Sequence, residues 1–82
     1  MDDPLPDFST LTESVVVGGI YEHYKGVLYK IIGLARHSES LEEMVVYQAL
    51  YGNNDIWVRP LGMFLEHTTF EDRLLPRFRF VK

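Results

Sequence analysis

Apolar and polar residues alternate along much of the chain with the period of two that is typical of β-strands. Two long β-rich runs, residues 27–37 and 44–51, flank a polar loop at residues 38–43. This arrangement indicates the central hairpin of a small antiparallel sheet. Further strands are predicted where shorter apolar runs recur, at residues 19–25, 56–59, 68–70 and 78–81.

Turn residues suggest how the first strands pair. Gly26 suits the left-handed position of a three-residue hairpin turn, and that turn places Tyr21 opposite Tyr29. In the next hairpin we expect Gly33 to face Ala49, a pair of small residues that leaves room for the sharp bend of a small barrel.

The third turn determines which side of the sheet the fourth strand presents. Asn53-Asn54 fits a two-residue hairpin, and that turn would put Trp57 and Arg59 on the same face as Leu50. Pro60 then favours a short helical turn over residues 61–65. The fold class predicted is all-β: a small five-stranded SH3-like antiparallel barrel with one short helical turn.

The chain has 82 residues, enough for one small domain. Residues 1–17 are predicted to be an acidic, disordered leader, and residues 18–82 a single β-barrel domain. The net charge of −4 belongs to the leader, because residues 1–19 contain four acids and no base, while residues 20–82 contain eight of each. Phe8, Leu11 and residues 15–17 are the apolar exceptions in the leader, and they are candidates for docking on the sheet.

Composition excludes several kinds of site. The sequence has no cysteine, so it forms neither a disulfide nor a thiolate metal site. No apolar run approaches the roughly 18 residues of a membrane span, so we predict no membrane contact. The start of the chain is acidic, which argues against a signal peptide and favours the cytoplasm. A neutral domain also lacks the broad positive field that nonspecific phosphate binding requires.

The second face of the central hairpin is unusually apolar for a sheet with one wet side. It is expected to carry Leu28, Ile32, Leu34, Val46 and Leu50, with Lys30, Arg36 and Gln48 among them. A strongly coiled five-stranded barrel would bury parts of both faces, because each long strand serves the core on different faces along its length. Otherwise the second face needs a cover, which the N-terminal segment, the C-terminal strand or a second subunit would provide.

Four blocks of sequence resemble a small bacterial family known as domain of unknown function 1653. These blocks are residues 19–26, 35–39, 46–52 and 57–64, within a resemblance that covers roughly residues 18–81. Gly62 stands where many family members carry an acidic residue, so no role of that carboxylate carries over. The resemblance implies no catalytic residues, and it marks the leader as an individual addition.

His23, His37 and Glu39 are the candidate polar site. They motivate the hypothesis of a small metal-dependent or hydrolytic enzyme, but their spacing matches no known zinc signature. Adjacent strand residues point to opposite sides, so residues 37–39 do not form a catalytic triad from one segment. We therefore predict no cofactor and no enzyme activity.

The aromatic residues are the stronger indication of function. Trp57 with Arg59 is the expected contact pair, with core packing of Trp57 as the alternative, and Tyr21 is expected to share a face with His23. We predict a noncatalytic binding or interaction module whose partner is another protein or a second copy. The alternative is a nucleic-acid-binding small barrel that also uses the cations near the C-terminus, namely Arg73, Arg77, Arg79 and Lys82.

Overall fold

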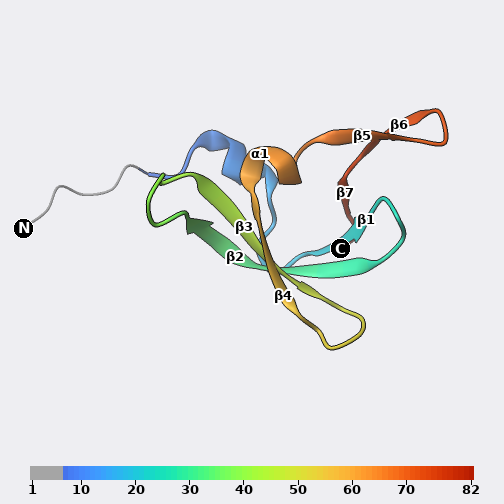
Figure 1. Cartoon of the computed structure of the whole chain (residues 1–82), viewed down its shortest axis with the longest axis horizontal. Helices are drawn as coiled ribbons and strands as arrows, with labels where there is room; N and C mark the ends of the chain where they lie inside the picture. Colours follow the sequence, from blue (N-terminus) through green and yellow to red (C-terminus); the bar gives the residue numbers. More distant parts are fainter. Residues whose placement is uncertain (1–6) are drawn as a thin grey trace, which may run out of the picture.

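A computed structural model describes residues 7–82 and confirms a mainly β fold (Figure 1). The strands form a five-stranded antiparallel sheet and a separate two-stranded one. In chain order the elements are η1 (Thr10–Ser14), β1 (Ile20–His23), β2 (Leu28–Arg36), β3 (Glu43–Ala49), β4 (Ile56–Pro60), α1 (Leu61–Phe64), β5 (His67–Phe70), β6 (Arg73–Pro76) and β7 (Phe78–Phe80).

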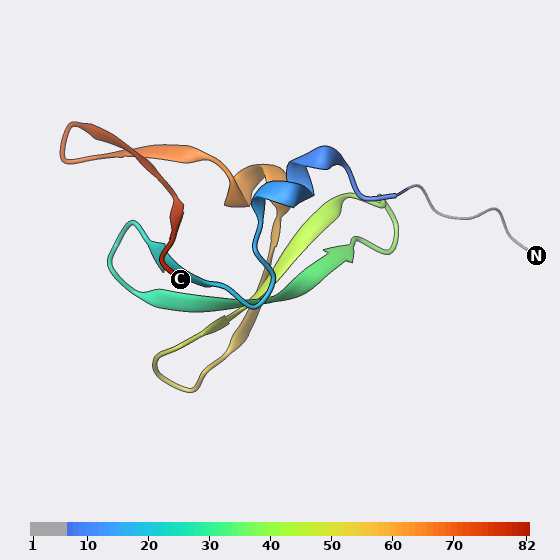
Figure 2. The ribbon, with the colours of Figure 1, turned by 180° about the vertical axis from the view of Figure 1, so that it is seen from behind.

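The larger sheet is open at both sides. Its strand order is β4-β3-β2-β1-β7, so β4 and β7 are the edges, and within residues 7–82 no ladder joins them into a closed barrel. Strands β1 to β4 run as a simple meander, and β7 returns to pair with β1. Seen from both sides, the sheet is strongly twisted, with η1 and α1 together at one side of it (Figures 1 and 2).

The predicted β1–β2 turn is confirmed. Gly26 has a φ of 99°, and its N–H donates to the carbonyl of His23 at 2.7 Å. Tyr21 therefore pairs with Tyr29, as the three-residue turn requires. The conformation is one that glycine adopts without the steric cost that other residues meet.

The predicted register between β2 and β3 is wrong. Gly33 pairs with Val46, while Ala49 pairs with Tyr29, and a β-bulge lies between Ile31 and Gly33. The extra residue of a bulge reverses the alternation of side chains beyond it. Leu34, expected on the second face, therefore packs against the core.

The β3–β4 connection is longer than the predicted two-residue turn. The last ladder bond runs from the N–H of Ala49 to the carbonyl of Asp55 at 2.9 Å, so residues 50–54 form the loop. Trp57 consequently pairs with Tyr47. This differs from the expected register by three residues, and an odd shift moves every side chain of the strand to the opposite face.

The N-terminal segment packs on the sheet over the part that the structure describes, whereas the leader had been expected to be loose. Val15 is buried in the core, and Thr12 is buried beside it. The backbone N–H and the hydroxyl of Ser9 both donate to the carboxylate of Glu43, at 2.5 and 2.6 Å. Residues 1–6 of the predicted leader lie outside the described residues.

Aromatic rings form the centre of the core. Phe64 of α1 and Phe78 of β7 stack with centroids 4.4 Å apart and planes 10° apart. Tyr21 and Tyr47 pack around this pair at 5.5 Å from Phe64 and 5.3 Å from Phe78, respectively. The short helix follows Pro60 as predicted. Within residues 7–82 no helix is long and apolar enough to cross a membrane.

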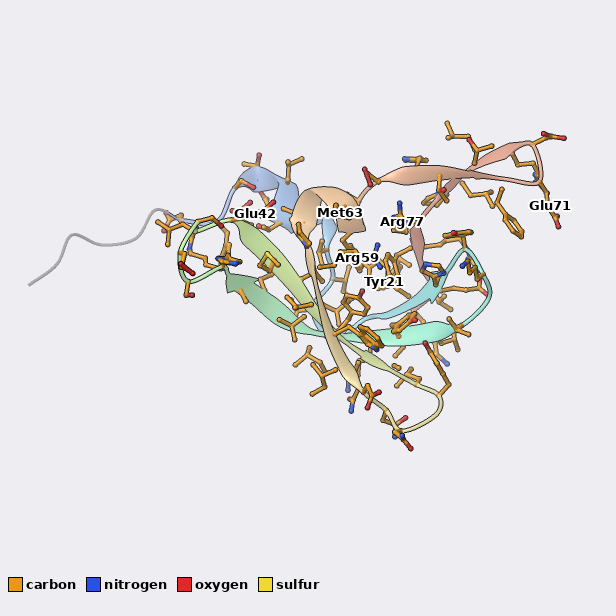
Figure 3. All side chains as sticks on the ribbon, viewed as in Figure 1. Tyr21, Glu42, Arg59, Met63, Glu71 and Arg77 are labelled. Carbon is orange, nitrogen blue, oxygen red and sulfur yellow. The ribbon has the colours of Figure 1, made fainter. Side chains whose placement is uncertain are left out.

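A two-stranded arm combines the strand predicted at residues 68–70 with a second strand that was not predicted. Strands β5 and β6 form a hairpin that extends away from the large sheet, with Glu71 at its tip (Figure 3). Glu71 and Asp72 both have positive φ, 52° and 63°, the geometry of a tight hairpin turn. Glu-Asp is not a typical sequence for that turn, so no strand was predicted at β6.

We expect Phe64→Ala to lower the free energy of unfolding by about 3–5 kcal/mol, because it removes one ring of the stacked pair and leaves a cavity. That loss is comparable to the total stability of a small domain. Urea denaturation checks it, with Leu74→Ala as the control, since Leu74 on β6 is 71% exposed and its truncation should cost within about 0.5 kcal/mol. Equal effects of the two substitutions would contradict the proposed core.

Candidate functional site

The side of the large sheet that faces away from α1 and η1 is called here the outer face. Cross-strand pairing places Val46 and Val58 on it, and Lys30, Gln48 and Ile56 form its next row. Leu50 joins this face where its N–H donates to the carbonyl of Leu28 at 3.0 Å. Over β2, β3, β4 and the residue after β3, the members of the outer face are Leu28, Lys30, Ile32, Val46, Gln48, Leu50, Ile56 and Val58. Over β1 and β7 the face continues with Ile20, Glu22 and Arg79.

Nothing in residues 7–82 covers the outer face. The buried residues of η1, α1 and β7 all belong to the core on the opposite, inner face. Leu28, Ile32 and Leu50 are 40–45% exposed, and Ile56 and Val58 are 63% and 56% exposed. A monomer thus presents a mostly apolar sheet face to solvent, a feature that often marks an interaction site.

Trp57 and Arg59 lie on the inner face, against the expectation that they would join Leu50. Arg59 donates from Nε to the hydroxyl of Tyr47 at 3.1 Å, and its guanidinium lies 5.6 Å from the centre of the Phe78 ring. Figure 3 shows Arg59 on β4 beneath α1. Trp57 lies opposite Tyr47 on the edge strand β4 and is 51% exposed.

Tyr21 and His23, which were expected to share a face, both lie on the inner face. Tyr21 is buried, and its hydroxyl accepts the N–H of Val16 at 2.9 Å, so it serves the core. His23 is half-buried, with its ring 4.4 Å from that of Tyr24. Desolvation by burial, followed by the positive charges of Arg59, Lys25 and Arg77, lowers the pKa of His23 below its usual value.

His37 and Glu39 lie in the loop between β2 and β3. The Nδ1 atom of His37 accepts the N–H groups of Glu39 and Ser40, at 3.2 and 3.3 Å, so this imidazole stabilises the turn. His23 precedes β2 and His37 follows it, so the nine residues of that strand separate them. No cluster of three metal-ligating side chains occurs in the described part of the chain.

The cations near the C-terminus point to different parts of the molecule. Arg79 forms an ion pair with Glu22, and Arg77 lies 3.5 Å from Glu66. Arg73 is on the β5–β6 arm. These side chains therefore form no continuous positive surface of the kind that phosphate backbones require.

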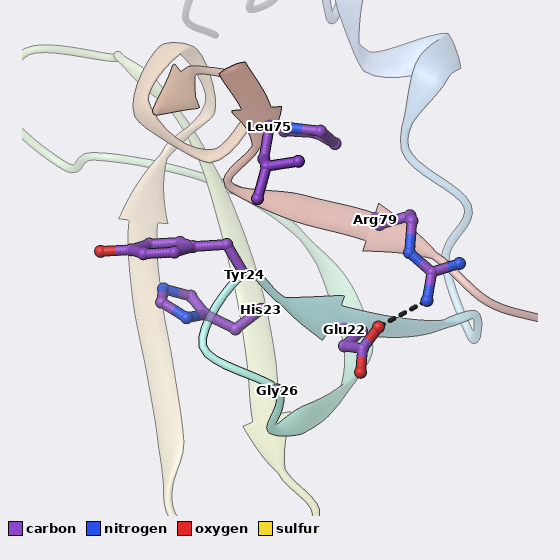
Figure 4. A pocket seen from close by; sticks show the side chains of 7 residues that line it. Glu22, His23, Tyr24, Gly26, Leu75 and Arg79 are labelled. Carbon is purple, nitrogen blue, oxygen red and sulfur yellow. Dashed lines mark hydrogen bonds and ion pairs between the residues drawn. The ribbon is translucent and has the colours of Figure 1, made fainter. Parts of the chain in front are cut away.

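A hollow lies between the β1–β2 turn and β6 (Figure 4). His23, Tyr24, Leu75 and the Glu22–Arg79 ion pair are among its lining residues. Its volume of about 170 Å³ is below the roughly 300–1,000 Å³ typical of small-molecule pockets. The ion pair is satisfied within the chain, so the hollow offers no free charge to a ligand from that pair.

Sequence reasoning missed two features of these surfaces. Ile56 and Val58 belong to the outer face. Their position could have been predicted only from the true length of the turn at residues 50–54. The hydroxyls of Tyr29 and Tyr51 also hydrogen-bond at 2.8 Å across the end of the core. Burial and this hydrogen bond raise the pKa of Tyr29 to about 12, so the phenol is a neutral structural group.

Comparison with known proteins identifies relatives of the same fold. The family model described as "Protein of unknown function (DUF1653)" matches residues 19–80. A crystal structure of a DUF1653 protein from Bordetella bronchiseptica is similar at 36% identity and a TM-score of 0.74, covering 83% of this chain and 90% of that one. No curated protein matches the sequence.

We expect stability to fall as the pH is lowered below about 6.5, the usual pKa of histidine. The pKa of His23 in the folded chain lies below its pKa in the unfolded chain. At a pH between these two pKa values His23 is protonated in the unfolded chain but mostly neutral in the folded one, so lowering the pH favours unfolding. The stability that depends on neutral His23 is fully present above pH 6.5 and is lost as the pH falls through its folded pKa. Urea denaturation at pH 7.5 and 5.5 measures it, and His23→Gln should reduce the difference. An NMR titration midpoint for His23 at or above 6.5 would contradict the prediction.

Proposed function

Because the chain belongs to the DUF1653 family of proteins of unknown function, we propose a function from its own surface: a noncatalytic protein-interaction module. Its outer face is the docking surface. The observation on which the proposal depends is the exposure of Ile32, Leu50 and Ile56 on a single open sheet face. Removing such apolar area from water favours association by about 25 cal/mol per Å² before the costs of binding are counted.

The composition of the outer face supports a protein ligand. Over β2, β3, β4 and Leu50, Lys30 and Gln48 are the polar members among six apolar ones, and the charges of Glu22 and Arg79 beyond β2 are paired with each other. Interfaces between proteins characteristically have apolar centres from which charged residues are depleted. Nucleic acid requires cations along the bound strand. Over the described residues the outer face offers Lys30 and Arg79, and Arg79 is already paired with Glu22.

We also propose that the large sheet is an SH3-like, partly open barrel. The sheet is a meander of four strands, a one-turn helix follows the fourth, and the last strand returns to the first. An open sheet of this kind keeps two free edges, whereas full closure would remove them. The proposed location remains the cytoplasm, as the sequence predicts.

Site-specific photocrosslinking in living cells tests the docking surface. A benzophenone amino acid at Ile32 or Leu50 is expected to give one discrete adduct, with another protein or with a second copy, because these side chains lie on the outer face. The same group at Leu74, an exposed apolar residue on the β5–β6 arm, is the matched control.

Equal labelling from the outer face and from Leu74, or no discrete adduct, would overturn the proposed function. A mobility-shift assay with short RNA and DNA distinguishes the nucleic-acid alternative. A bound complex that weakens steeply between 50 and 200 mM salt, with a slope set by phosphate contacts, would favour that alternative instead.

A further inference from the structure

We infer that this module also associates with a second copy of the same chain, through antiparallel pairing of the two β4 strands about a two-fold axis at Trp57. This inference goes beyond the proposed function, because the pairing uses the edge of the sheet and leaves the outer face open to its own partner. The pairing would extend the five-stranded sheet of each copy into a continuous sheet across both.

The free edge of β4 offers unused backbone groups. The N–H of Ala49 donates to the carbonyl of Asp55, so Asp55 faces β3. Hydrogen-bonding groups alternate in direction along a strand, and therefore those of Trp57 and Arg59 also face β3. The N–H and C=O groups of Ile56 and Val58 point away from the sheet, and no residue within 7–82 pairs with them.

The centre of the edge lacks the usual protection against pairing. Natural edge strands are generally guarded by charge, by a bulge or by a covering element. Here three consecutive apolar residues, Ile56, Trp57 and Val58, are 63%, 51% and 56% exposed. The opposite edge, β7, shows the contrast, because Arg79 on it forms an ion pair with Glu22.

The ends of β4 limit the register. Asn54 has a φ of 58°, which departs from strand geometry, and its N–H is already donated to Tyr51. Pro60 has no N–H to donate. The run available for pairing is residues 55–59, and its centre is Trp57.

Pairing centred on Trp57 satisfies every outward backbone group of that run. Ile56 and Val58 of the second copy then exchange N–H···O bonds with Val58 and Ile56 of the first. Centring on Val58 would set Ile56 opposite Pro60, which cannot return a hydrogen bond. Centring on Ile56 would need the N–H of Asn54, which is already used.

The same register is complementary in charge. It places Asp55 opposite Arg59 of the second copy, twice by symmetry. These are non-hydrogen-bonded pairs, in which facing side chains lie closest. No residue within 7–82 forms an ion pair with Asp55, and the terminal N–H groups of Arg59 have no hydrogen-bond partner there.

The pairing also enlarges the outer face. Ile56 lies opposite Val58 of the second copy on that side, so the two outer faces become one apolar surface. On the inner side the two Trp57 rings meet across the axis. Cross-strand aromatic and β-branched pairs of this kind contribute to sheet stability.

Disulfide trapping tests the register directly. The chain has no cysteine, so Trp57→Cys introduces the only thiol. Facing residues of a non-hydrogen-bonded pair are about 4.5 Å apart at Cα, within the range of a disulfide. In a glutathione redox buffer we expect Trp57→Cys to form a covalent dimer at least about tenfold faster than Leu74→Cys or Val58→Cys. Equal rates for the three variants would overturn the register.

Charge exchange tests the association without a covalent bond. By sedimentation equilibrium the native chain should approach twice its 9.6 kDa as concentration rises. Asp55→Lys and Arg59→Glu should each remain monomeric, because like charges then face each other. An equal mixture of the two should dimerise again, since opposite charges are restored. Circular dichroism checks that each variant is folded. If Arg59→Glu does not fold, disulfide trapping at position 57 remains the test of the pairing.

A native chain that stays at 9.6 kDa at all concentrations would overturn the dimer. Such a result leaves the proposed function intact if photocrosslinking at Ile32 or Leu50 still captures another protein. Loss of every adduct from the outer face, with dimerisation preserved, would instead overturn the docking surface and keep the β4 pairing.

Discussion

The stacked rings of Phe64 and Phe78 hold the fold together, because they join the two ends of the sheet, which no strand ladder connects among the described residues. Phe64 comes from α1, and Phe78 comes from β7 at the far edge of the sheet. Tyr21 and Tyr47 contact this pair from strands between the two edges. The sheet therefore bends around one aromatic cluster, although no ladder joins β4 to β7 among the described residues.

This construction places every covering element on the inner face. The bulge beside Ile32 sharpens the division, because Ile31 before it is buried and Ile32 itself is exposed. Leu34 after it packs on the core. A chain this short has few apolar residues to spare, and it nevertheless leaves a row of them on the outer face. The loss of apolar burial in the monomer is the physical reason to expect a partner there.

Local signals in the sequence determined more of the fold than of the site. Gly26 indicated a turn whose geometry allows one register, and that register was confirmed. The turn at Asn53-Asn54 was misjudged by three residues, and the error moved Trp57 to the opposite face. The bulge at Ile32 had no signal in sequence, because it depends on how two long strands fit together. Candidate site residues depend on such registers, so they were less predictable than the strands themselves.

The β3–β4 turn has a consequence beyond the choice of face. Side-chain direction and hydrogen-bond direction both alternate along a strand, so one register determines both. With Trp57 opposite Tyr47, Ile56 and Val58 direct their side chains to the outer face and their amides to the free edge. A register shifted by one residue would have turned the amides of Trp57 and Arg59 to the free edge instead, and the charged side chain of Arg59 would then stand at a pairing position. The length of the loop at residues 50–54 therefore gives Ile56 and Val58 both an apolar side chain on the outer face and unpaired backbone groups at the free edge.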